Sequence, residues 1–235
     1  MLLADPPPGR EARSLSPLAH LRLLQLASPA LPVGAYTYSQ GLEWAAEQGW
    51  VGDEAGAGRW IGALLRHPLA LFEAPMLAGM QEAFRCGDVS RWQALNQWYR
   101  ASRECREMAA ESQQMGYSLL QLACSLGEEP LLVAEEEVSF LLIWAWLSER
   151  WQIDPLSAVS GYLWSWLENQ VLAAVKLVPL GQTAGQRVLW RLAAEIPLLA
   201  EQALSLPEEE WNGLAPGWMI AGSGHETQYS RLFRS

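Results

Sequence analysis

Apolar residues recur every three or four positions along most of this chain, and proline or glycine separates one such stretch from the next. In the clearest stretch, Val159, Tyr162, Leu163 and Trp166 would all lie on one side of an α-helix. No run of alternating β-branched residues indicates a strand, and no segment repeats at a fixed period. The pattern predicts an all-α protein that forms a single-domain multi-helix bundle.

Helix-capping residues and chain breakers set the expected element boundaries. Helices are expected to begin after Ser16, Asp53, Asp88 and Asp154, and near Thr37 and Gln40, which have capping-box spacing. A short helix over 42–48 is expected to end at Gly49, which tolerates the left-handed conformation.

Three longer segments need further boundaries. Residues 89–126 contain no proline but exceed the length of ordinary helices, so a break is expected near Ser102 or Gly116. Residues 135–137, all glutamate, are expected in the first turn of a helix that reaches Trp151. A last long helix is expected over 182–204.

The two ends of the chain differ from its middle. Residues 1–16 include three successive prolines and are expected to be disordered, whereas 17–215 are expected to form one all-helical domain. Residues 216–235 contain Pro216-Gly217 and Gly222-Ser223-Gly224 and are expected to form a flexible C-terminal tail. Within it, Tyr229, Leu232 and Phe233 have the i, i+3, i+4 spacing of a helix that docks in a groove. A frayed terminus is the alternative.

The content of charged residues is low for a soluble protein. Only 18% of the 235 residues are charged, against roughly 25% in typical domains, and half are hydrophobic. The chain must therefore hide more apolar surface than usual, which favours an oligomer or a subunit of a complex. The 13 tryptophans fit either a tryptophan-rich core or an interface, and both alternatives stay open.

Charge and targeting signals narrow the class of protein. The net charge of −10 opposes binding to nucleic acid, whose affinity for proteins rests largely on Lys and Arg. The N-terminus has no basic, apolar signal sequence, and the longest strongly apolar stretch, 140–147, is too short to cross a membrane. Three separate cysteines indicate neither a disulfide framework nor a thiolate metal site. A soluble cytoplasmic protein is expected.

The residues that carry chemistry are sparse. The only histidines are His20, His67 and His225, which show no metal-ligand spacing, so weak nickel binding by the isolated protein is expected. The only lysine is Lys176, so there is no P-loop, and no G-x-S-x-G elbow occurs. We therefore expect no enzyme activity, no catalytic or metal-binding residues and no cofactor. Lys176 stands alone in an apolar segment, either for a functional reason or as a snorkelling helix end.

Three stretches of the chain resemble the UreF family of urease accessory proteins. They are Leu23–Trp50 (LLQLASPALPVGAYTYSQGLEWAAEQGW), Lys176–Gln182 (KLVPLGQ) and His225–Ser235 (HETQYSRLFRS). Residues 103–106 with Gly116 are a weaker match. The resemblance extends from about Leu18 over nearly the whole chain, in the middle through its helical pattern. Many relatives have Phe-Ser-His-Ser where this chain has Tyr-Thr-Tyr-Ser at 36–39, so no metal role is carried over to that position.

The resemblance implies an all-α homodimer that binds the accessory protein UreD (also called UreH), recruits the GTPase UreG and docks on apo-urease. It implies a scaffold that regulates GTP-dependent nickel delivery. The candidate partner-binding residues are Tyr38, Ser39, Glu43, Lys176, Gly181, Gln182, His225, Glu226, Tyr229, Ser230, Arg231, Leu232, Phe233 and Arg234. The alternative is a helical enzyme or pocket protein that binds an apolar ligand among its tryptophans, which fluorescence titration with metabolites and with UreD would distinguish.

Overall fold

The structure is a computed structural model that describes residues 15–235. Most of the N-terminal segment for which the sequence predicts disorder lies outside these residues. The described part contains helices and no β-strand, which confirms the all-α prediction. The α-helices are α1 (Pro17–Leu26), α2 (Leu42–Glu47), α3 (Glu54–Leu64), α4 (Ala74–Cys86), α5 (Val89–Ala101), α6 (Arg106–Ser125), α7 (Phe140–Arg150), α8 (Pro155–Leu177), α9 (Gln182–Ala193), α10 (Ile196–Ser205) and α11 (Pro216–His225).

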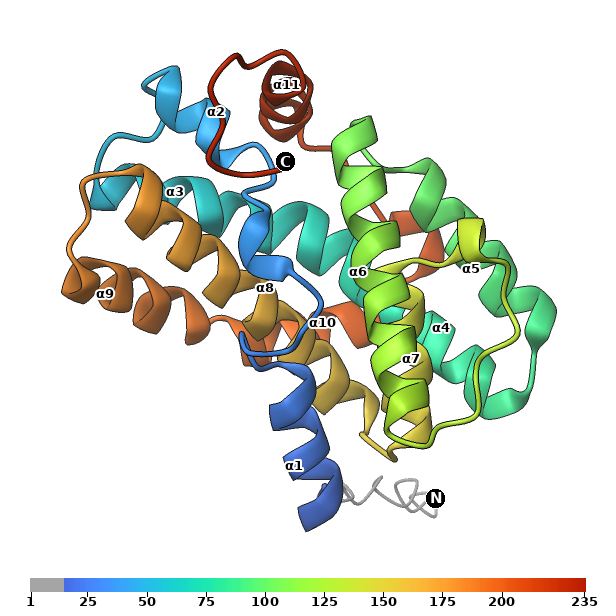
Figure 1. The fold of residues 1–235 in the computed structure, drawn as a ribbon. Coiled ribbons are helices and arrows are strands. Elements are labelled where there is room, and N and C mark those ends of the chain that lie inside the picture. The colour runs from blue at the N-terminus through green and yellow to red at the C-terminus, as the bar shows by residue number, and fades with distance from the viewer. Residues whose placement is uncertain (1–14) are drawn as a thin grey trace, which may run out of the picture.

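The helices pack around α8, which runs through the middle of the molecule (Figure 1). Helices α3 and α9 lie on one side of it, and α4, α6 and α7 lie on the other (Figure 1). Helix α1 projects from one end of the bundle, whereas α2, α11 and the C-terminus gather at the opposite end (Figure 1). The C-terminus of the chain therefore lies near α2, a helix from the first part of the sequence.

Four predicted helix starts are confirmed, because the side chains of the capping residues accept the expected backbone N–H. The side chains of Ser16, Asp53, Asp88 and Asp154 each accept a hydrogen bond from the N–H three residues later, at 3.1, 2.6, 3.0 and 3.0 Å. These bonds satisfy N–H groups that have no partner within the first turn of a helix. Single capping residues thus predicted these four helix starts correctly.

The break expected in 89–126 occurs at Ser102 and not at Gly116. Helix α5 ends at Ala101, and Gly116 lies inside α6. A side chain at Gly116 would approach the backbone of Ser139 to 2.5 Å, so glycine is required here for close packing and not for a turn.

Three other boundaries differ from the predictions. Thr37 lies in a 3₁₀ turn and donates to the Gly34 carbonyl at 2.8 Å, while α2 begins only at Leu42, so no capping box forms. The glutamates at 135–137 form a separate 3₁₀ turn before α7, which Ser139 caps. The segment 182–204 divides into α9 and α10, because the ring of Pro197 would clash inside a continuous helix.

The core is formed chiefly by α4, α7 and α8. Every residue from 141 to 148 in α7 is buried, which accounts for the long apolar stretch in the sequence. Trp144 lies at the centre with no exposed surface, and its indole donates to the Ala158 carbonyl of α8 at 3.2 Å. Among residues 15–235, no helix combines the length and the hydrophobicity needed to cross a bilayer.

Candidate partner-binding site

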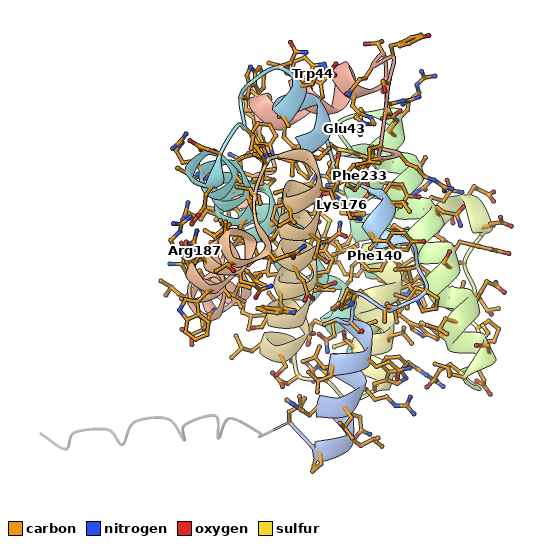
Figure 2. The ribbon with its side chains drawn as sticks, turned by 60° about the vertical axis from the view of Figure 1, so that its left-hand side comes forward. Glu43, Trp44, Phe140, Lys176, Arg187 and Phe233 are labelled. Carbon is orange, nitrogen blue, oxygen red and sulfur yellow. The ribbon has the colours of Figure 1, made fainter. Side chains whose placement is uncertain are left out.

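The last ten residues of the chain lie across α2 and the beginning of α6. Helix α11 leads into this C-terminal segment, residues 226–235, and packs beside α2 (Figure 1). Side chains from both ends of the sequence meet here, since Glu43 and Phe233 lie next to each other and near Lys176 (Figure 2). This is where most of the residues predicted to bind a partner come together.

The glycines before this segment serve close packing. The sequence predicts a flexible tail from residue 216, but in the structure residues 216–225 form α11. A side chain at Gly224 would collide with the indole of Trp44, and one at Gly222 would meet Met108 at 2.9 Å. The two glycines thus allow α11 to lie against α2 and α6, a tertiary contact that local composition cannot reveal.

Glu43 is the centre of the contact between the C-terminal segment and α2. Its side chain is buried, with 7% of the residue exposed. One carboxylate oxygen accepts the N–H of Leu232 at 2.6 Å, and the other accepts the N–H of Phe233 at 2.9 Å. The second oxygen also lies 3.2 Å from Nε2 of His225. A buried carboxylate is costly unless such donors surround it.

Glu107 supplies a second carboxylate from the first turn of α6. It lies 2.6 Å from Nδ1 of the fully buried His225, and its other oxygen pairs with Arg231. Glu43 and Glu107 therefore contact opposite nitrogens of one imidazole and do not converge on a single point. Within the described residues, no group of three or more His, Cys, Asp or Glu side chains is arranged to hold a metal ion.

The end of the segment is held by hydrogen bonds with residues 37–39. The Ser235 carbonyl accepts hydrogen bonds from the N–H and the hydroxyl of Ser39 at 2.8 and 2.6 Å. The N–H of Arg234 donates to the carbonyl of Thr37 at 2.8 Å. The Arg234 side chain also hydrogen-bonds Tyr38, whose pKa is raised by burial. The end of the C-terminal segment thus packs against residues 37–39.

The side chains of the segment point in two directions. Phe233 is 6% exposed, and the ammonium group of Lys176 lies 5.5 Å from the centre of its ring. Tyr229 and Leu232 face solvent, with 104% and 66% exposure. The segment is therefore anchored by one apolar residue and presents two others outward.

The remaining candidates lie at the margins of this site. Glu226 accepts the N–H of Arg106 at 2.8 Å and so caps α6, and the carbonyl of the exposed Ser230 accepts from Gln228 at 3.1 Å. Gly181 and Gln182 are exposed at the start of α9. None of the hydrogen bonds described above for the C-terminal segment involves either of those two residues.

A buried polar network that the sequence did not predict lies beneath the segment. Glu111, one turn after Glu107 on α6, accepts from Gln40 at 2.6 Å and from the Ser235 hydroxyl at 2.7 Å. Burial raises the pKa of the Glu111 carboxyl to about 7. The i, i+4 spacing of Glu107 and Glu111 was the available signal, since it places both carboxylates on one face of a helix.

The network continues to an ion pair in the interior. Arg103 and Glu73 lie 2.7 Å apart, with 7% and 3% of their side chains exposed, and Tyr162 donates to the same carboxylate. Glu73 reaches this position from a π-helical stretch, Leu65–Glu73, that accommodates Pro68. The cavity beside these groups measures about 50 Å³, which suits a few water molecules better than an organic ligand.

An open apolar groove lies elsewhere, between α8 and α9. Its volume is about 830 Å³, and its walls include Trp164, Leu189 and Trp190. Trp190 is 84% exposed, whereas Trp144 is fully buried. The tryptophans are therefore divided between the core and the surface, and an interface stays a prediction for the exposed ones.

Comparison with known proteins places the chain among urease accessory proteins. The model of the UreF family matches residues 51–193, more than half of the chain. The chain belongs to the UreF family. A relative from Azoarcus sp. (strain BH72), named Urease accessory protein UreF, is 54% identical over 231 residues, which cover 95% of this chain and 98% of the relative. A relative with the same name from Dechloromonas aromatica (strain RCB) is 51% identical over 220 residues, covering 91% and 96%.

The match to the family model and the C-terminal site lie in different parts of the chain. The family model ends at Ala193, before α11 and the C-terminal segment begin. The alignments with both relatives cover more than nine tenths of the chain. The family model therefore covers residues 51–193 only, whereas the relatives align over most of the remaining chain as well. The role of the C-terminal segment is argued from its own contacts.

Proposed function

We propose that this chain is a scaffold in the maturation of urease, which binds UreD (UreH), UreG and apo-urease and regulates GTP-dependent nickel delivery. Its membership of the UreF family supports the general role of a urease accessory protein. In this scheme nickel is the cargo of the complex. The scaffold contributes binding surfaces and no catalytic residues.

The observation that carries the proposal is the pair of exposed apolar side chains on an anchored segment. Leu232 faces outward while its own N–H donates to Glu43, and Tyr229 is fully exposed three residues earlier. Tyrosine and arginine are among the residue types most enriched at the energetic centres of protein interfaces. Arg231 and Arg234 add guanidinium groups at the same edge. We assign this face to UreD.

A homodimer is the second part of the proposal. The groove between α8 and α9 and the exposed Trp190 provide apolar surface of the kind that a dimer would cover, in agreement with the low fraction of charged residues. Sedimentation of the purified chain tests this part, with a monomer at micromolar concentration as the contradicting result.

Co-purification tests the proposal as a whole. The full chain is co-expressed with UreD, UreG and urease, and the isolated complex is assayed for stoichiometry and for urease activity. The expected result is a complex that contains the chain and UreD in equal amounts, together with active urease. Full urease activation in cells that lack this chain would contradict the proposal.

A further inference from the structure

We propose that a cavity between α5, α6 and the start of α7 binds a small oxyanion of the size of phosphate. Helices α5, α6 and α7 lie on the opposite side of α8 from α9, so this site is separate from the apolar groove (Figure 1). The proposal concerns the chain alone and does not depend on a role in urease maturation. The side chains in the cavity lining that can donate a hydrogen bond are Arg100, Arg103, Ser112, Gln113 and Ser139.

The wall of the cavity carries a positive charge that no carboxylate balances. The guanidinium group of Arg100 donates to the carbonyl of Glu136, and no Asp or Glu side chain within residues 15–235 forms an ion pair with it. The glutamates at 135–137 are exposed and offer main-chain carbonyls to the neighbouring helices. An anion in the cavity would therefore meet a free guanidinium group.

Arg103 leaves one buried donor without an acceptor. Only 7% of its side chain is exposed, and within the described part of the chain its Nε has no hydrogen-bond partner. One terminal nitrogen pairs with Glu73 at 2.7 Å, and the other lies 3.5 Å from the Ser102 hydroxyl. A buried N–H is destabilising until an acceptor reaches it. An oxygen atom in the adjoining cavity would supply that acceptor.

Helix α7 begins at the wall of the same cavity. Ser139 caps this helix and accepts the N–H of Leu142 at 3.2 Å, and Ser112 of α6 accepts the N–H of Phe140 at 3.3 Å. Gly116 lets α6 approach this end of α7, because a side chain there would collide with the backbone of Ser139. The N–H groups and the dipole at a helix N-terminus favour negative charge. The start of α7 thus adds to the attraction of the two arginines.

The size of the cavity and its donors select the ligand. Its volume is about 80 Å³, which holds about five water molecules or one phosphate-sized ion. Nucleotides and peptides need several times this space. Guanidinium groups form paired hydrogen bonds with the oxygens of an oxyanion, which a halide with a single acceptor atom cannot match. Ala109 and Gln113 are exposed, so the ion can enter from the surface of α6.

Calorimetric titration of the full free chain with inorganic phosphate tests the site. Sodium chloride keeps the ionic strength constant, because salt screens every charged contact. Arg100→Gln is the test variant, and Arg91→Gln, at the other end of α5 and paired with Glu208, is its matched control. We expect one phosphate per chain with a dissociation constant of about 1 mM or lower. Affinity should fall about tenfold or more in Arg100→Gln and less than about twofold in Arg91→Gln.

Amide hydrogen exchange locates the bound ion. At about ten times the dissociation constant of phosphate, exchange at residues 139–141 should slow about tenfold, because opening of this end of α7 must release the ion. The same phosphate concentration should not slow exchange there in Arg100→Gln. Phosphate binding without slower exchange at 139–141 would overturn the site. Equal affinity of Arg100→Gln and the unmodified chain would overturn it as well.

A second pair of variants keeps the test valid if Arg100→Gln does not fold. Gln113 is exposed at the cavity, so Gln113→Glu adds a negative charge at its edge and Gln113→Lys adds a positive one. Phosphate affinity should fall in the first variant and not in the second. Equal affinities in the two variants would contradict an anion in this cavity.

Titration with glycerol phosphate distinguishes the free ion from the phosphate group of a larger molecule. Because the cavity holds little more than the ion itself, glycerol phosphate should bind at least about tenfold more weakly than inorganic phosphate. Equal affinity for the two compounds would overturn the assignment to a free ion.

Discussion

Helix α7 and the C-terminal segment are held in place by different kinds of interaction. Helix α7 packs apolar side chains against α4, α6 and α8, with Trp144 at its centre. In the C-terminal segment, a carboxylate of α2 accepts two backbone N–H groups and a carboxylate of α6 accepts the Ser235 hydroxyl, and the segment buries a single phenylalanine. The first arrangement stabilises the whole fold, whereas the second fixes the position of ten residues. Substitutions in the two regions should therefore differ in what they disrupt.

The largest effect is expected in the core. Trp144→Ala removes a fully buried indole and should lower the free energy of unfolding by about 3–5 kcal/mol. Urea denaturation followed by circular dichroism measures this loss. Trp190→Ala, at an 84% exposed position, is the control and should change the stability of the isolated chain little. Equal losses in the two variants would mean that the division between buried and exposed tryptophans is wrong.

A pH effect is expected where the segment meets the buried network. Burial raises the pKa of Glu111 from 4.5 to about 7, so the folded state holds this proton more tightly than the unfolded state. Glu111 thus contributes most to the free energy of unfolding below pH 4.5, and its contribution falls by about 3 kcal/mol as the pH rises to 7. The groups that face this carboxyl are Gln40, Ser235, Arg103 and Glu73.

Glu111→Gln isolates that contribution. Glutamine carries no titrating proton. As the pH rises from 4.5 to 7, the unmodified chain should therefore lose stability relative to the variant. Urea denaturation at half-unit steps of pH provides the measurement. A difference that is constant with pH would contradict a raised pKa of Glu111 in the folded state.

The next effect separates the inner and outer faces of the segment. Tyr229→Ala and Phe233→Ala should each weaken UreD binding by about 2 kcal/mol. Only Phe233→Ala should also accelerate amide exchange in the segment, because Tyr229 makes no buried contact with the body. Calorimetry and hydrogen exchange on the same samples measure both quantities. Accelerated exchange in Tyr229→Ala would contradict the assignment of the two faces.

The smallest effect on stability is expected at Lys176. Its ammonium group lies 5.5 Å from the Phe233 ring at an exposed position, a contact that contributes about 0.5–1 kcal/mol. Lys176→Ala should therefore change the melting temperature little. As a proposed partner-binding residue, Lys176 should affect urease activation when it is replaced. Lys176→Arg retains the cation and is the control. A large fall in melting temperature with normal activation would assign a structural role to this lysine.

The same contrast explains what the sequence could predict. Local signals predicted the helical class and four helix starts, because N-cap side chains such as Asp53 and Asp154 act on N–H groups three residues away. They failed where distant segments decide the conformation. Gly224 is a packing residue against Trp44, and Glu43 finds its donors about 190 residues later, so no window of sequence contains both partners.

The candidate site was predicted in part by family resemblance. Most of the residues that resemble the family at the two ends of the chain, such as Ser39, Glu43 and Phe233, do meet in space. Gly181 and Gln182 lie outside the hydrogen-bonded site. Glu107 and Glu111 were missed, although their i, i+4 spacing on one helix face was visible in the sequence.

Deletion of residues 229–235 tests the central claim that the C-terminal segment is the anchor for UreD. The truncated and full chains are compared by size-exclusion chromatography with UreD, after circular dichroism has established their helicity. The account predicts that the truncated chain stays folded, melts near the temperature of the full chain, and neither binds UreD nor supports urease activation. Co-elution of the truncated chain with UreD at full stoichiometry would contradict it.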